Sequence, residues 1–186
     1  KMLHWKETDP FAKDGMGLDF GAIAKGYIAD QIKEFLISKG VESAIIDLGG
    51  NTSASAKNLM DHIHIGIQKP FAERSETIAA LEINDKSVVS SGIYERYFEK
   101  DGNFYHHILN PKTGYPYDNS LISVTIISDK SVDGDGLSTT CFALGLEKGM
   151  ELINSLPDVQ AVFITDDYQL HYSDHFNDEL TVIDVN

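Results

Sequence analysis

The sequence predicts an α+β domain in which a mostly antiparallel sheet packs against helices. Segments with strand character outnumber helical ones, and two pairs of them are joined by turn sequences short enough for hairpins. The expected order is a helix, several strands, a helix and further strands, whereas a doubly wound parallel sheet alternates strands with helices. We expect residues 1–186 to form a single domain.

The first clear element is an amphipathic helix that begins near Gly21 and ends at Gly40. Large apolar side chains recur in it at helical spacing: Ile23, Tyr27, Ile28, Ile32, Phe35 and Leu36. An apolar run over residues 43–50 predicts a buried strand that ends in a tight glycine turn. Residues 62–67 and 77–83 predict two further strands.

The second half of the chain predicts two hairpins, one strand and one helix. Residues 100–103 form a turn sequence between two aromatic, alternating arms, which is typical of a hairpin. Residues 120–127 predict a continuous apolar strand, and the segment from about 133 to 156 predicts a helix with a weak point at 145–149. Residues 159–173 predict the second hairpin.

Composition narrows the possible functions. The formal charge of −14 is spread along the chain, so no basic stripe is present to bind a phosphate backbone, and we expect no nucleic-acid partner. An anionic ligand would need a cation, a helix N-terminus or isolated lysines. The single cysteine, Cys141, lies among apolar residues and is expected to be a buried structural thiol. No apolar run approaches the roughly 20 residues of a membrane span.

Residues 133–145 hold the spacing most suggestive of a metal site. If Asp135 lies in the first helical turn, Thr139 at i+4 projects from the same face, and a carboxylate and a hydroxyl could reach one hard cation. Oxygen ligands in small number suit Mg²⁺, which keeps positions for water and substrate phosphates. The alternative is that Asp133 or Asp135 caps the helix and complements its dipole.

Small residues surround the start of the first helix, in residues 19–30, with Lys25 close by. Gly and Ala allow a ligand near the backbone, and the helix N–H groups together with Lys25 would attract an anion. Gly21 and Gly26 could equally serve close helix packing. The hydroxyls of residues 90–92 could bind a phosphate or a ring edge, or belong to an ordinary strand with a bulge.

Two neighbouring histidines, His106 and His107, end the second arm of the first hairpin. Strand alternation sends them to opposite faces, so they cannot both bind one metal ion. One of them should point inward, where a neutral imidazole could act as a general base near pH 7. The alternative is a core histidine whose hydrogen bonds are satisfied.

Several blocks become specific when they are taken in order: DFGAIAKGYIAD, IIDLGGN, HIHIGIQKP, VVSSGIYERYFEKDGNFYHHILNPKTGYP and SVTIISDKSVDGDGLSTTCFALGLEKG. From about residue 13 to residue 172 they resemble the successive blocks of the ApbE family, the FAD:protein FMN transferases. The resemblance implies an ApbE-like domain related to the T-fold, as the C-terminal portion of such a protein. It implies Mg²⁺-dependent cleavage of the FAD pyrophosphate, with transfer of FMN to a Thr or Ser hydroxyl of an acceptor protein and release of AMP. Some members hydrolyse FAD to FMN and AMP instead.

The same resemblance implies roles for individual residues. The metal would be held by the backbone carbonyl of Ala22 and by the side chains of Asp135 and Thr139. FAD contacts map onto Asp19, Lys25 and Leu109, and His107 corresponds to the base that activates the acceptor hydroxyl, with His106 facing away. The resemblance also implies an extracytoplasmic protein that a lipid anchor in its N-terminal part ties to the membrane.

Two departures from the family pattern bear on activity. Asn110 stands where the family usually has Asp before Pro111. If that Asp orients the base, activity is reduced here; if it only caps the turn, Asn does the same. Family members also carry an N-terminal portion outside this chain that helps to enclose FAD. Both departures favour the alternative of a flavin-binding module without catalysis.

Overall fold

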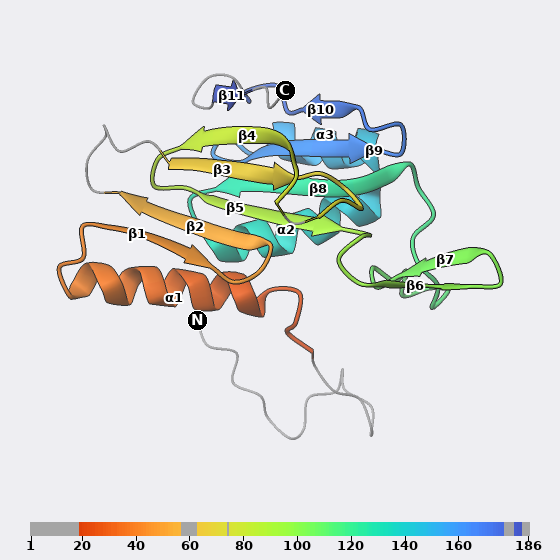
Figure 1. Ribbon diagram of the computed structural model, residues 1–186, viewed down its shortest axis with the longest axis horizontal. Coiled ribbons are helices and arrows are strands. Elements are labelled where there is room, and N and C mark those ends of the chain that lie inside the picture. The colour runs from red at the N-terminus through yellow and green to blue at the C-terminus, as the bar shows by residue number, and fades with distance from the viewer. Residues whose placement is uncertain (1–18, 57–62, 74, 177–180, 184–186) are drawn as a thin grey trace.

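The computed structural model describes residues 19–56, 63–73, 75–176 and 181–183, in three layers (Figure 1). A six-stranded sheet lies in the middle, with the helices against one face and a three-stranded sheet against the other (Figure 1). The elements are α1 (Ala24–Ser38), β1 (Ser43–Asp47), β2 (Asn51–Ala56), β3 (Ile63–Gln68), β4 (Thr77–Ile83), β5 (Ser87–Gly92), β6 (Tyr97–Lys100), β7 (Asn103–His106), β8 (Leu121–Ser128), α2 (Ser131–Leu144), α3 (Leu146–Asn154), β9 (Gln160–Thr165), β10 (Leu170–Tyr172) and β11 (Thr181–Ile183).

All neighbouring strands in these sheets are antiparallel. The six-stranded sheet has the order β1-β2-β5-β8-β9-β10, and the three-stranded sheet has the order β11-β4-β3. Strands β6 and β7 form a separate hairpin that projects from the body of the molecule (Figure 1). The predicted α+β class with mostly antiparallel strands is confirmed.

Two apolar cores hold the layers together, one on each face of the central sheet. Between the sheets, side chains such as Val88, Ile127 and Leu81 pack together. On the helix face, Val124, Ile126 and Phe163 pack against helix residues that include Phe142. Alternation along the central strands supplies both cores, because successive side chains point to opposite faces. Cys141 belongs to the helix-side core, and burial raises the pKa of its thiol to about 11, so the predicted structural role is confirmed.

Helix α1 confirms the predicted helix but only part of its apolar face. Its fully buried residues are the small Gly26 and Ala29, whereas Tyr27 and Phe35 are 58% and 59% exposed. Of the predicted apolar residues, only Ile32 and Leu36 are half-buried. The helix therefore approaches its neighbours mainly through small side chains.

Two elements agree with the prediction only in part. The strand predicted within residues 43–50 is β1, and the predicted glycine turn follows it, but the strand is not buried as expected, because only Ile46 of its residues is buried. The next strand, β2, was not predicted, since its sequence, NTSASA, carries no strand signal. The helix expected from residue 133 begins at Ser131, and it ends at the predicted weak point, where Gly145 has a φ of +80°. No helix in the described part of the chain is both long and apolar enough to span a membrane.

Candidate functional site

The site is built where α1 crosses the beginning of α2. Gly26 lies at the contact, and a Cβ atom there would stand within 2.7 Å of the Val132 Cα and still closer to the Ser131 carbonyl. Only glycine permits this approach, since the obstructing atoms are backbone. Of the two roles left open for Gly26, close helix packing is the one that the structure shows.

Asp30 of α1 caps the N-terminus of α2. Its two carboxylate oxygens accept hydrogen bonds from the backbone N–H groups of Ser131 at 2.8 Å and Val132 at 3.0 Å. These are N–H groups that have no partner within the helix. The alternative that Asp133 or Asp135 caps α2 is therefore wrong, because the cap comes from another helix.

Asp135 lies in the second turn of α2, not in the first, and is 5% exposed. One carboxylate oxygen accepts the backbone N–H of Gly26, and the other accepts the side-chain Nδ2 of Asn51 at 3.1 Å. Each oxygen retains lone-pair capacity for a further partner. The carboxylate is thus tied to α1 and to β2 at once.

The bond from Gly26 changes the start of α1. In a regular helix the N–H of Gly26 would donate to the carbonyl of Ala22, four residues earlier. Here it donates to Asp135, and no backbone N–H of the described residues donates to the Ala22 carbonyl. A carbonyl oxygen is left available beside the segment that holds Asp135.

Thr139 follows Asp135 by one helical turn and is half-buried. Its hydroxyl lies 3.2 Å from the hydroxyl of Ser91 on β5. A carbonyl, a carboxylate and a hydroxyl form a set of hard oxygen donors, which fits Mg²⁺. The described residues contain no group of three or more His, Cys, Asp or Glu side chains that could hold a metal ion.

The hydroxyls of residues 90–92 are engaged within the protein. Ser91 bonds Ser138 at 2.8 Å as well as Thr139, and Ser90 bonds Thr125 at 2.8 Å. The hypothesis that these hydroxyls bind a phosphate is weakened, because each already has a hydrogen-bond partner within the protein. They belong to β5, as the alternative predicted.

The predicted flavin-contact residues Asp19 and Lys25 flank the start of α1. The Asp19 carboxylate accepts the N–H of Gly21 at 2.7 Å, which fixes the turn that leads into the helix. The Lys25 ammonium donates to the Gly49 carbonyl at 2.9 Å and stays exposed. The structure therefore brings Asp19, Ala22 and Lys25 together at one helix end.

The two histidines divide as alternation requires, but the inward one is His106. It is 7% exposed, its Nδ1 accepts the N–H of Ile108 at 3.2 Å, and its Nε2 donates to the Tyr117 carbonyl at 3.0 Å. Its ring packs edge-on against Phe142, and burial lowers its pKa. His106 is therefore the core histidine with both nitrogens satisfied, and the inward histidine is not His107, to which the role of base was assigned.

His107 is exposed and held in one tautomer. Its Nδ1 lies 3.2 Å from the Arg96 carbonyl, which can only accept, so the proton is on Nδ1. The backbone N–H of His107 donates to the same carbonyl at 3.1 Å. Nε2 is therefore unprotonated in the neutral ring, which is what a base needs.

Asn110 caps the turn that follows His107. Its side-chain oxygen accepts the N–H of Lys112 at 2.9 Å, and its backbone carbonyl accepts the N–H of Gly114 at 2.8 Å. Leu109 is exposed and pairs with Pro116 across the turn. Of the two roles weighed for this position, the structure shows the cap, which Asn and Asp fill equally well.

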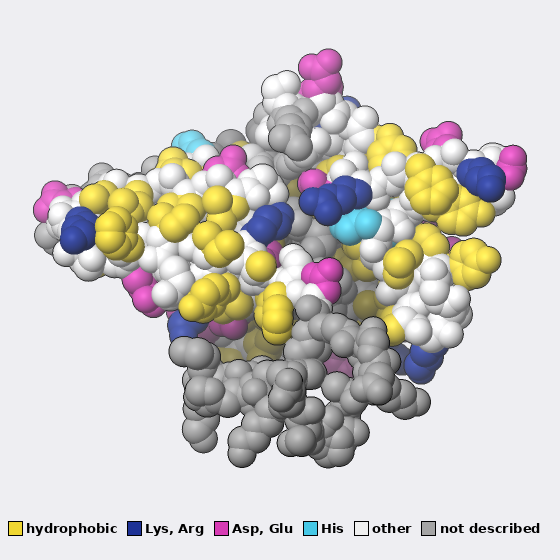
Figure 2. All heavy atoms as spheres, turned by 90° about the horizontal axis from the view of Figure 1, so that it is seen from below, with side chains coloured by type: hydrophobic (Ala, Val, Ile, Leu, Met, Phe, Trp, Pro, Cys, Tyr) yellow, Lys and Arg dark blue, Asp and Glu magenta, His cyan; other side chains and the backbone are white. Residues whose placement is uncertain are grey.

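Figure 2 shows the helix face of the molecule. Hydrophobic side chains are exposed over α1 and over the β6–β7 hairpin, and Lys or Arg side chains lie beside a histidine between these two lobes. Asp or Glu side chains lie next to them, so both signs of charge are present between the lobes (Figure 2).

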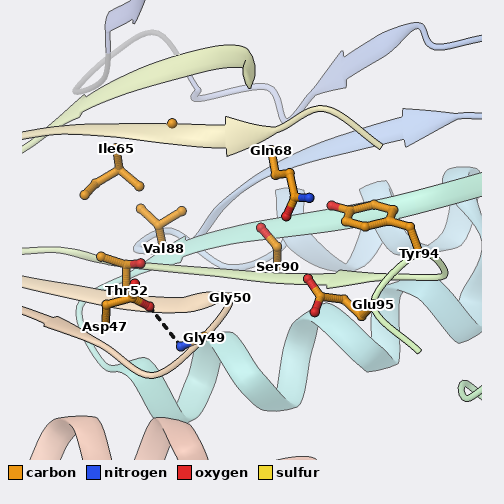
Figure 3. Close-up of a pocket in the computed structure, with 11 residues that line it drawn as sticks. Asp47, Gly49, Gly50, Thr52, Ile65, Gln68, Val88, Ser90, Tyr94 and Glu95 are labelled. Atoms are coloured by element: carbon orange, nitrogen blue, oxygen red, sulfur yellow. Dashed lines mark hydrogen bonds between the residues drawn. The ribbon is translucent and has the colours of Figure 1, made fainter. Parts of the chain in front are cut away.

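A polar pocket of about 220 Å³ lies on the opposite face of the central sheet, beneath β3 (Figure 3). Gln68, Ser90, Tyr94 and Glu95 surround it, together with the Gly49–Gly50 turn (Figure 3). Burial raises the pKa of Tyr94, so its phenol remains a neutral donor. No lysine, arginine or histidine is among the described lining residues, so the pocket favours a neutral polar group over a phosphate.

A family model described as ApbE family matches residues 1–163. The chain belongs to the ApbE family. A relative in Klebsiella pneumoniae named FAD:protein FMN transferase is 51% identical over 151 residues, which make up 81% of this chain and 46% of the relative. A relative in Treponema pallidum with the same name is 40% identical over an alignment 189 positions long, which covers 96% of this chain and 52% of the relative.

Solved ApbE structures have the same fold. The crystal structure of the ApbE protein of Thermotoga maritima matches with a TM-score of 0.78 at 30% identity, over 88% of this chain and 53% of that one. The apo form of the Pseudomonas stutzeri flavinyl transferase ApbE matches with a TM-score of 0.71 at 32% identity, over 87% and 50%. The chain spans about half the length of these ApbE proteins.

Two residues of this ApbE site were missed by sequence reasoning. Asp30 had a usable signal, since it lies four residues after Gly26 and so shares its helix face. Asn51 had none, because it opens a strand of small polar residues that matched no strand pattern. Its role appears only when β2 is placed under α2.

Proposed function

We propose that this chain carries the metal-binding and base-bearing part of a Mg²⁺-dependent FAD:protein FMN transferase. The FMN phosphorus is transferred to a Thr or Ser hydroxyl of an acceptor protein, and AMP leaves. The single observation that carries the proposal is the set of oxygen donors at the α1–α2 crossing, where the Ala22 carbonyl and the Asp135 carboxylate share Gly26 as a neighbour. The names of the relatives support the class of reaction.

Ala22, Asp135 and Thr139 would hold Mg²⁺. Bound there, the cation would supply charge neutralisation to the pyrophosphate and to the departing AMP. Lys25, in the first turn of α1, adds a positive charge whose ammonium group is exposed. On an acidic chain these groups supply the attraction that FAD phosphates require.

His107 takes the proton from the attacking hydroxyl. Its Nδ1–H is engaged by the Arg96 carbonyl, so Nε2 is the atom that accepts the proton. As the acceptor oxygen bonds to the FMN phosphorus, the bond from that phosphorus to the bridging oxygen breaks and AMP leaves with that oxygen. Asn110 contributes by fixing the turn and not by charging the base.

The test is an assay of the protein with FAD, Mg²⁺ and a candidate acceptor domain. Covalent fluorescent flavin on the acceptor with stoichiometric AMP is the expected result. Free FMN and AMP without labelled acceptor would identify the hydrolase variant of the same chemistry. Stable FAD binding without AMP release would overturn the proposal in favour of a non-catalytic flavin-binding module.

Two substitutions assign the roles. Asp135→Ala should abolish stimulation by Mg²⁺, and His107→Ala should lower the rate by about 10²-fold or more. His64→Ala, at an exposed position of β3, serves as the matched histidine control and should leave the rate unchanged. Full Mg²⁺ stimulation in Asp135→Ala would remove the metal assignment.

A further inference from the structure

We propose that Asn51 is a positioning residue that holds the Asp135 carboxylate in its cation-binding orientation, an inference that rests on the proposed function. Asn51 is the first residue of β2 and is 0% exposed. A buried amide needs partners for its donors and its acceptor. Both sets of partners of Asn51 lie on α2, the helix that carries the predicted metal ligands.

The hydrogen bonds fix which way the amide faces. The Asp135 carboxylate can only accept, so Nδ2 of Asn51 must face it, at 3.1 Å. The Asn51 oxygen then accepts the hydroxyl of Ser131 at 2.5 Å, and that hydroxyl accepts from Ser87 at 2.9 Å. The amide has one orientation only, because a flipped amide would set two acceptors against each other.

Asn51 and Gly26 together determine the carboxylate plane. Oδ1 of Asp135 accepts from Asn51 on β2, and Oδ2 accepts from the Gly26 N–H on α1. One donor alone would leave the carboxylate free to rotate about the bond to its Cβ. Two donors from different elements hold both oxygens, so the remaining lone pairs keep one direction.

The position of Asn51 in the chain extends this role. It follows the Gly49–Gly50 turn directly, and the Gly49 carbonyl accepts the Lys25 ammonium. The same turn therefore positions both the Lys25 ammonium, which would attract the anion, and the Asn51 amide, which orients the Asp135 carboxylate. Outer-shell partners of metal ligands are worth about 10- to 100-fold in metal affinity.

The experiment measures Mn²⁺ binding directly, by the electron paramagnetic resonance signal of free Mn²⁺, on the full-length protein with and without FAD. Asn51→Ala should weaken binding by about 10-fold or more. Ser131→Ala keeps the amide but removes the bond that orients it, and should weaken binding by a smaller factor in the same direction. Mn²⁺ affinity in Asn51→Ala within about 2-fold of the parent protein would overturn the proposal.

Two controls separate positioning from stability. Asn119→Ala removes another structural amide, which bonds Phe142 and Leu121, and it should lower the melting temperature without changing Mn²⁺ affinity. Ser87→Ala removes the far end of the network and should change affinity little. A loss of Mn²⁺ affinity in Asn119→Ala equal to that in Asn51→Ala would show a general stability effect and overturn the proposal.

Failure of the proposed function gives a different result. If the parent protein neither binds Mn²⁺ nor releases AMP, the function is wrong, and the orientation of Asp135 is then determined by crystallography. In Asn51→Ala the carboxylate should rotate away from its position in the parent protein. A crystal structure with the carboxylate unmoved would overturn the role of Asn51 whatever the enzyme does.

Discussion

The α1–α2 junction and the loop after β7 hold their functional side chains in opposite ways. At the junction, Asp135 is 5% exposed and accepts one donor from α1 and one from β2. In the loop, His107 and Leu109 are exposed, and backbone carbonyls and turn bonds fix their positions. The junction is part of the folded core, whereas the loop is attached to it.

Substitutions at the junction and in the loop should therefore have different effects on stability and function. A change at the junction disturbs packed backbone and buried polar groups, so it should reduce stability and function together. A change at the exposed loop removes a chemical group while the fold remains. Under the proposed function, the junction binds the cation and the loop contacts the acceptor protein.

Gly26→Ala should break the junction and have the largest effect. The added methyl group would lie within 2.7 Å of the Val132 Cα, and backbone cannot move aside as a side chain would. We expect the free energy of unfolding to fall by about 3 kcal/mol, measured by urea denaturation. Gly136→Ala is the matched control in α2, because its nearest obstacle is the Ile23 side chain at 3.9 Å. It should stabilise by up to about 1 kcal/mol, and equal losses in the two variants would contradict the crossing.

The loop and the junction also differ in how far the sequence could predict them. The aromatic hairpin and the turn after His107 follow from local patterns, so β6 and β7 agree with expectation, and the Asn110 cap is one of the two roles weighed for that position. The junction depends on contacts between residues far apart in the chain, such as Gly26 with Asp135 and Asn51 with Ser131. No local sequence pattern predicts those pairings. The strand β2, which places Asn51 beside α2, was not predicted because its residues are small and mostly polar. Which histidine turns inward also depended on tertiary packing, against Phe142.

Asp30→Ala tests the junction through the cap of α2. Removing the carboxylate leaves the N–H groups of Ser131 and Val132 without their side-chain partner. We expect a loss of about 1–2 kcal/mol in the free energy of unfolding. Asp133→Ala removes an exposed carboxylate from the same helix turn and should cost less than about 1 kcal/mol. A larger loss in Asp133→Ala than in Asp30→Ala would show that the cap is assigned to the wrong residue.

His106 packs in the core at the end of β7. Its contribution to the free energy of unfolding should depend on pH. Burial is the main cause that lowers its pKa below 6.5, and neighbouring His107 acts in the same direction, while the bond to Tyr117 opposes them. The unfolded chain therefore binds the proton more readily, so this stability is present above about pH 6.5 and is lost as the pH falls from there toward the folded-state pKa. Urea denaturation between pH 7.5 and 5.5 should show the parent losing more stability than His106→Gln. His107→Gln keeps His106 and its burial, so it should keep most of the loss, reduced only by the small contribution of His107. A slope unchanged in His106→Gln would refute the assignment.

Asn110→Asp should have the smallest effect. It tests the difference between the loop and the junction, because it adds a charge in the loop without altering the turn. An aspartate oxygen at this position can accept the same N–H of Lys112, so the free energy of unfolding should stay within about 0.5 kcal/mol of the parent. Asn110→Ala has no acceptor and should lose about 1 kcal/mol by urea denaturation. On the proposed function, AMP release by Asn110→Asp should remain within about 3-fold of the parent, since the Arg96 carbonyl and not residue 110 orients His107. A rise of 10-fold or more would mean that a carboxylate here charges the base, and the loop would then act on its histidine through side-chain charge, whereas the junction holds its carboxylate by hydrogen bonds from a backbone N–H and a neutral amide.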